Sequence, residues 1–97
     1  MLSFVMIKSW KHKGLKRFYE IGSASGIQPH HQKRLKIILQ QLNAAIRASD
    51  MNVPGMKFHL LTGNYKGAYS VAVDKNWRVI YAFEGQDAIL VDYLDYH

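Results

Sequence analysis

The sequence contains no cysteine, and several kinds of segment are missing as well. Without thiols the chain can form neither disulfides nor thiolate zinc sites, and it is compatible with a reducing compartment. No apolar run approaches the ~20 residues that a membrane span requires. Residues 1–8 lack the basic start and the cleavage region of a signal peptide, and we expect them to form a first strand. These absences favour a soluble, cytoplasmic protein.

Acidic residues are scarce in the first half of the chain. Residues 1–49 contain one acid, Glu20, but nine of the thirteen lysines and arginines, and the formal net charge is +6. Such a positive field attracts a phosphate backbone or an acidic protein partner and speeds the encounter with either. The alternative is a solvated helix face, which is what most charge runs are.

The length and the apolar spacing indicate one domain, residues 1–97, in which two helices follow the N-terminal strand. Between residues 11 and 21 the apolar side chains have helical spacing, and Gly22 offers a C-terminal stop. Pro29 suits the first turn of a second helix, which we expect to end near Ser49-Asp50. Its apolar stripe consists of Leu35, Ile38, Leu39, Leu42 and Ile46.

After Pro54-Gly55 the apolar pattern changes from helical to alternating, with Met56, Phe58 and Leu60 on one face of a strand. Strands are expected at residues 56–61, 68–73, 77–83 and 88–94, joined by short turns as an antiparallel meander. The predicted class is α+β: an N-terminal strand and two helices packed on a curved, mainly antiparallel sheet of four to five strands.

Proton-handling residues interrupt this predicted sheet. His59 and Arg78 lie on separate strands, and the last strand runs into Asp95-Tyr96-His97. If the strands curl, these groups converge on one patch. Imidazoles can take a proton from a ribose 2′-OH and return one to the departing 5′-oxygen, while a guanidinium stabilises the added negative charge. The set is suited to metal-free RNA cleavage.

Structural roles are the alternative for each of these residues. A lone histidine on a strand, such as His59, is more often a hydrogen-bonded structural residue than a catalyst. Arg78 has Asp92 and Asp95 as alternative ion-pair partners. Trp77 and Tyr69 suit core or edge packing better than base stacking.

The adjacent histidines His30 and His31 raise the question of a metal site. Neighbouring residues on a helix point in different directions, and the sequence offers no matching carboxylate cluster. We therefore expect neither a metal site nor a cofactor.

Five segments together carry a family resemblance: KSWKHKGLKRF (8–18), MNVPG (51–55), GAYSVAV (67–73), NWRV (76–79) and the final DYH (95–97). The chain resembles HigB-type toxins of the RelE/ParE superfamily over nearly its whole length. The resemblance implies a RelE-like fold and a ribosome-dependent mRNA endonuclease that needs no metal. It also implies a HigA-type helix-turn-helix antitoxin as partner, with operator DNA bound only through the complex and no contact with a membrane.

The resemblance assigns catalytic roles to His59, Arg78, Asp95, Tyr96 and His97. It suggests that eight basic residues contact RNA or the ribosome: Lys11, Lys13, Lys16, Arg17, Lys33, Arg34, Lys57 and Lys66. Lys57 and Lys66 are the weaker of these assignments. There is one departure from the family pattern. Some relatives have LKG where this chain has Leu61-Thr62-Gly63, so a lysine expected near the scissile phosphate is replaced by an uncharged hydroxyl.

Two other functions remain open. A ParE-like gyrase poison resembles this fold and needs no acid–base residues, although the DYH ending argues against it. A non-catalytic nucleic-acid-binding module would need only the basic helices.

Overall fold

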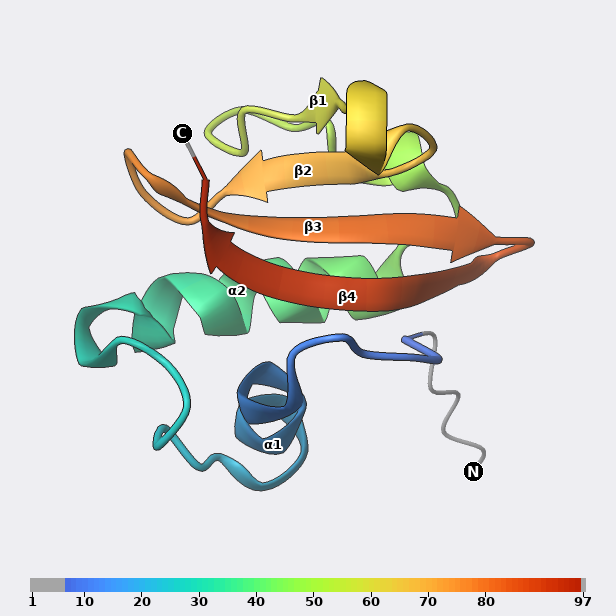
Figure 1. Ribbon diagram of the computed structural model, residues 1–97. Helices are drawn as coiled ribbons and strands as arrows, with labels where there is room; N and C mark the ends of the chain where they lie inside the picture. The colour runs from blue at the N-terminus through green and yellow to red at the C-terminus, as the bar shows by residue number, and fades with distance from the viewer. Residues whose placement is uncertain (1–6, 97) are drawn as a thin grey trace.

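The computed structural model describes residues 7–96, so most of the strand expected at residues 1–8 lies outside the described residues (Figure 1). Two helices precede a sheet in the chain. The helical segments are α1 (Lys13–Ile21), η1 (Pro29–His31), α2 (Gln32–Ala44), η2 (Ala48–Met51) and η3 (Gly63–Tyr65). The strands are β1 (His59–Leu60), β2 (Tyr69–Ala72), β3 (Trp77–Glu84) and β4 (Asp87–Asp95).

The sheet is the predicted antiparallel meander, in the order β1-β2-β3-β4. The segment before α1 runs along the free edge of β4, where Ile7 and Trp10 form isolated parallel bridges. The β3–β4 register shifts between Ile80 and Ala82, and Leu90 opposite has a positive φ of 55°. An extra residue in one strand bends a sheet, so this bulge contributes to its curvature.

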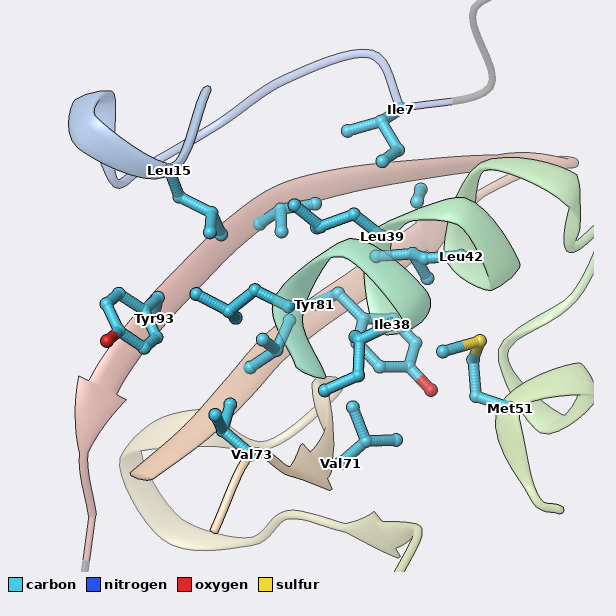
Figure 2. Packing of buried hydrophobic residues seen from close by; sticks show 14 of the residues in the cluster. Ile7, Leu15, Ile38, Leu39, Leu42, Met51, Val71, Val73, Tyr81 and Tyr93 are labelled. Atoms are coloured by element: carbon cyan, nitrogen blue, oxygen red, sulfur yellow. The ribbon is translucent and has the colours of Figure 1, made fainter. Parts of the chain in front are cut away.

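Both helices cover one face of the sheet, as the α+β prediction requires (Figure 1). The buried side chains of α2 meet those of β2 and β3, and Figure 2 shows Ile38 and Leu42 of α2 together with Val71 and Tyr81 of the sheet. Helix α1 adds Leu15 to the same core and ends at Gly22, with φ 76°, as predicted. Of the helices that the structure describes, none is long and apolar enough to cross a membrane.

The second helix is shorter than its apolar spacing predicted. It ends at Ala44, and the predicted end near Ser49-Asp50 is wrong. The Asp50 carboxylate accepts hydrogen bonds from the backbone N–H groups of Ile46 and Arg47. Because this carboxylate offers the backbone an alternative to helical bonds, the chain leaves the helix, and Ile46 is left 42% exposed.

The first strand of the meander is also shorter than predicted. Alternation indicated a strand over residues 56–61, but β1 contains only His59 and Leu60. Lys57 has a left-handed backbone with φ 50°, which a strand cannot accommodate. The same break brings the Lys57 carbonyl within hydrogen-bond distance of His59 and Arg78.

Candidate active site

A hollow of about 230 Å³ lies on the sheet face opposite the helices. It brings together three of the residues predicted to be catalytic, His59, Arg78 and Tyr96. The other residues that line it are Leu60, Leu61, Thr62 and Ser70.

The strand register explains this convergence. His59 of β1 lies opposite Ser70 of β2, and Ser70 lies opposite Ile80 of β3. Arg78 is two residues from Ile80 and therefore projects from the same face. The core side chains Val71 and Val79 alternate with these residues and face the helices.

The backbone carbonyl of Lys57 orients the two main polar groups. Its oxygen is 2.8 Å from Nδ1 of His59 and 3.3 Å from Nη1 of Arg78. A carbonyl can only accept, so the proton of a neutral His59 lies on Nδ1. Nε2 then carries a lone pair, which is the state a general base requires.

Arg78 is held from a second side by Ser70. Its Nη1 donates to Ser70 Oγ at 3.1 Å, and Ser70 is only 1% exposed. Sequence reasoning missed Ser70, because a serine within an apolar strand carries no pattern that marks it as functional.

The tail of β4 reaches the hollow through Tyr96. Its backbone N–H donates to the carbonyl of Asn76 at 2.8 Å, and its ring meets that of Tyr65 edge to face. Asp95 is exposed and lies opposite Trp77 in the register. Because neighbouring residues of a strand alternate between its faces, Asp95 points away from the face of Tyr96, and it is not among the residues that line the hollow. His97 lies outside the described residues, and its role remains a prediction.

A second hollow of about 200 Å³ lies along the same open face. Two of the bases predicted to contact RNA, Lys11 and Lys66, line it together with Tyr65 and Asp92. Lys66 therefore lines the second hollow and not the first, whereas Thr62 lines the first hollow together with His59 and Arg78.

The remaining predicted RNA contacts occupy other surfaces. Lys13, Lys16 and Arg17 are exposed on α1, and Lys33 lines a groove between α1 and α2. Arg34 has a structural task, because its guanidinium donates to the carbonyls of Ala72 and Gly55 and so ties α2 to the sheet and to the loop before β1.

The histidine pair has a neighbour that the sequence did not indicate. Nε2 of His31 is 2.6 Å from the Asp74 carboxylate, and Nδ1 is 2.7 Å from the Tyr93 hydroxyl. The rings of His30 and His31 lie 4.2 Å apart, so the expected divergence of the pair is wrong. Hydrogen bonds from the Trp77 N–H, from His31 and from the Asn76 N–H lower the pKa of Asp74 to about 2.

Comparison with known proteins points to one family. Residues 8–97 match the family described as RelE-like toxin of type II toxin-antitoxin system HigB. The chain is 39% identical over 92 residues to Endoribonuclease HigB of Proteus vulgaris, covering 95% of this chain and 100% of the relative. It is 36% identical over 95 residues to Toxin HigB-1 of Vibrio cholerae serotype O1, covering 95% of this chain and 98% of the relative.

Proposed function

Because this chain belongs to the HigB family of RelE-like toxins from type II toxin–antitoxin systems, we propose that it cleaves mRNA on the ribosome without a catalytic metal ion. The named activity of the Proteus vulgaris relative, endoribonuclease, is the chemistry that this site is suited to perform. The observation that carries the proposal is the pairing of a base-competent His59 with Arg78 in one hollow.

In the proposed reaction His59 is the general base. Nε2 takes the proton of the ribose 2′-OH, and the resulting oxygen attacks the adjacent phosphorus. The hydrogen bond between Nδ1 and the Lys57 carbonyl supports this role, since it fixes the tautomer and stabilises the imidazolium that forms.

Arg78 is the electrostatic partner in this scheme. Its guanidinium neutralises the charge that grows on the non-bridging oxygens as the 2′-oxygen adds. Thr62 can donate a hydrogen bond to the same phosphate but adds no charge, so Arg78 supplies the positive charge for which some relatives also have a lysine.

The tail residues supply the general acid. When the bond to the 5′-oxygen breaks, that oxygen takes a proton, leaving a 2′,3′-cyclic phosphate and a 5′-hydroxyl end. We assign this proton to His97, which directly follows Tyr96 in the chain, and we assign Tyr96 to contact with the substrate. We place Asp95 beside His97 as the carboxylate that orients it.

The ribosome completes the site by aligning the message. The hollow is shallow and open, so little in the chain itself fixes the scissile phosphate in line for attack, and a bound ribosome supplies that orientation. Lys11 and Lys66 are assigned to mRNA phosphates beside the cleaved bond, with Lys57 adding charge. The exposed bases of α1 and Lys33 of α2 are assigned to ribosomal RNA.

A type II toxin has an antitoxin partner. We propose a HigA-type antitoxin with a helix-turn-helix domain, through which the pair reaches its operator DNA. The site of action is the cytoplasm, where translating ribosomes are found.

Purified protein tests the proposal directly. An mRNA is incubated with the chain alone, with programmed ribosomes alone, and with both, and new 5′ ends are mapped. Cleavage that requires both components is the expected result. Equal cleavage of free RNA would contradict ribosome dependence, and the absence of cleavage together with inhibition of gyrase would favour the ParE-like alternative.

A further inference from the structure

A cluster of two histidines and an aspartate lies at the end of the sheet where β2 turns into β3. His30 and His31 belong to η1, directly before α2, and Asp74 belongs to the turn. Figure 1 shows the start of α2 and this turn at the same end of the molecule. One ligand atom from each residue lies within 4.8 Å of the other two. We propose that His30, His31 and Asp74 bind a divalent transition-metal ion, with Zn²⁺ as the best match.

The distances in the cluster suit a tetrahedral ion. Asp74 Oδ2 is 2.6 Å from Nε2 of His31 and 4.0 Å from Nε2 of His30. Two ligand atoms that each bind one tetrahedral zinc ion at ~2.0 Å lie about 3.3 Å apart. Reaching that value lengthens the separation of Oδ2 from His31 by about 0.7 Å and shortens its separation from the exposed His30 by about 0.7 Å.

The ligands are already oriented by other groups. The second oxygen of Asp74, Oδ1, accepts from the backbone N–H groups of Asn76 and Trp77, which fixes the carboxylate and leaves Oδ2 toward the histidines. Nδ1 of His31 bonds to the Tyr93 hydroxyl. A histidine that binds a metal through one nitrogen usually has such a partner on the other, because the partner fixes the ring orientation and the tautomer.

The proton balance of binding is simple. Nε2 of a neutral His31 shares its proton with Asp74, and when a metal binds Nε2 the ring changes tautomer, so this proton passes to Nδ1 and none is released. A neutral imidazole then carries its proton on Nδ1, where the oxygen of Tyr93 can accept it. Two imidazoles and one carboxylate leave the fourth zinc position to water. Entry is open, because the side chains of His30 and Asp74 are 70% and 39% exposed.

The cluster is separate from the proposed cleavage site. The ring of His31 contacts those of Trp77 and Tyr93, which pack against the core on the helix side. Arg78 follows Trp77 on β3 and faces the other side. The backbone links the two regions, since the Asn76 carbonyl in the β2–β3 turn accepts a hydrogen bond from the Tyr96 N–H. A metal that ties η1 to this turn therefore stabilises the fold and the anchor of the tail.

The test uses the full chain free of any affinity tag, with zinc chloride as the probe. Calorimetric titration is expected to give one zinc per chain, a higher melting temperature with zinc, and no response to magnesium. His30→Ala should weaken binding at least about 10-fold and abolish the thermal shift, because it removes an exposed ligand but leaves the His31–Asp74–Tyr93 hydrogen bonds intact. His59→Ala removes another exposed histidine and is the matched control, which should bind zinc as the parent does.

Three results would overturn the site: no zinc binding by the parent, equal binding by His30→Ala, or loss of binding in the His59→Ala control. Circular dichroism of His30→Ala shows whether its fold is kept. If that fold is lost, Asp74→Asn, which keeps an oxygen for the turn, is titrated instead and must also fail to bind. None of these readouts depends on RNA cleavage, so the metal site and the proposed function stand or fall separately.

Discussion

His59 and Arg78 share one hydrogen-bond acceptor, the backbone carbonyl of Lys57, at 2.8 Å and 3.3 Å. One oxygen thus holds an imidazole from β1 and a guanidinium from β3 at the same hollow. It also fixes the tautomer of His59 that leaves Nε2 free. The left-handed backbone at Lys57, which shortens β1, belongs to the same feature.

Ser70→Ala is expected to reduce cleavage while the protein stays folded. The Ser70 hydroxyl is buried and holds Arg78, and losing one hydrogen bond worth about 1 to 1.5 kcal/mol predicts a fall of about 5- to 13-fold in the cleavage rate. Single-turnover cleavage on programmed ribosomes measures it. Ser49→Ala, at an exposed serine of η2, should cleave at the parental rate, and an unchanged rate in Ser70→Ala would mean that Ser70 does not position Arg78.

Neutralising Lys13, Lys16 and Arg17 together to glutamine is expected to weaken ribosome binding in a salt-dependent way. If all three contact phosphates, the slope of log affinity against log salt should fall by about 2 to 3. Sedimentation with ribosomes across a salt series measures this slope. The matched control exchanges lysine and arginine at the same positions and keeps the charge. Equal slopes for the two triple variants would remove α1 from the ribosome interface.

Gly26→Ala is expected to destabilise the fold. An added Cβ at Gly26 would lie 2.6 Å from the Cα of Gly14, and backbone cannot move aside as a flexible side chain can. Overpacking of this kind costs about 1–3 kcal/mol of unfolding free energy. Urea unfolding provides the measurement. The neighbouring exposed Ser25→Ala should change stability by less than about 0.5 kcal/mol, and a similarly small effect in Gly26→Ala would show that the loop shifts freely.

Tyr81→Phe links stability to alkaline pH. At neutral pH the variant loses the hydrogen bond from Tyr81 to the Ala48 carbonyl, at a cost of about 1 kcal/mol. Burial, and to a lesser degree the charge of Tyr69, raise the pKa of Tyr81. The neutral phenol is therefore favoured in the fold, and its contribution is complete below pH ~10 and falls as the pH rises above that value. Unfolding measured from pH 7 to 11 should show parental stability falling more steeply than that of Tyr81→Phe, and parallel curves would contradict this.

Periodicity predicted the parts of the fold that local physics determines. The helical spacing before Gly22 and the β-rich runs predicted α1, β3 and β4 close to their observed bounds. The errors occurred where a local group competed with the periodic pattern. The Asp50 carboxylate takes the N–H groups that would extend α2, and the left-handed Lys57 ends the alternation before β1.

The candidate site was predictable where it rests on side chains with distinctive chemistry. His59 and Arg78 were expected to converge, and they line the same hollow. The contributions of Ser70 and of the Lys57 carbonyl could not be predicted, because one is a common residue and the other is backbone. The approach of Asp74 to the two histidines depends on tertiary packing between residues that lie 43 positions apart in the chain.

The most direct test of the proposed active site compares His59→Ala and Arg78→Ala with the parent by mapping mRNA 5′ ends on ribosomes. Ribosome sedimentation and thermal unfolding of the same preparations establish that the variants bind and fold. Both variants are expected to bind ribosomes as the parent does and to produce few or none of the new 5′ ends. If folded, ribosome-bound variants cut at the parental sites and rates, the hollow between β1 and β3 is not the active site.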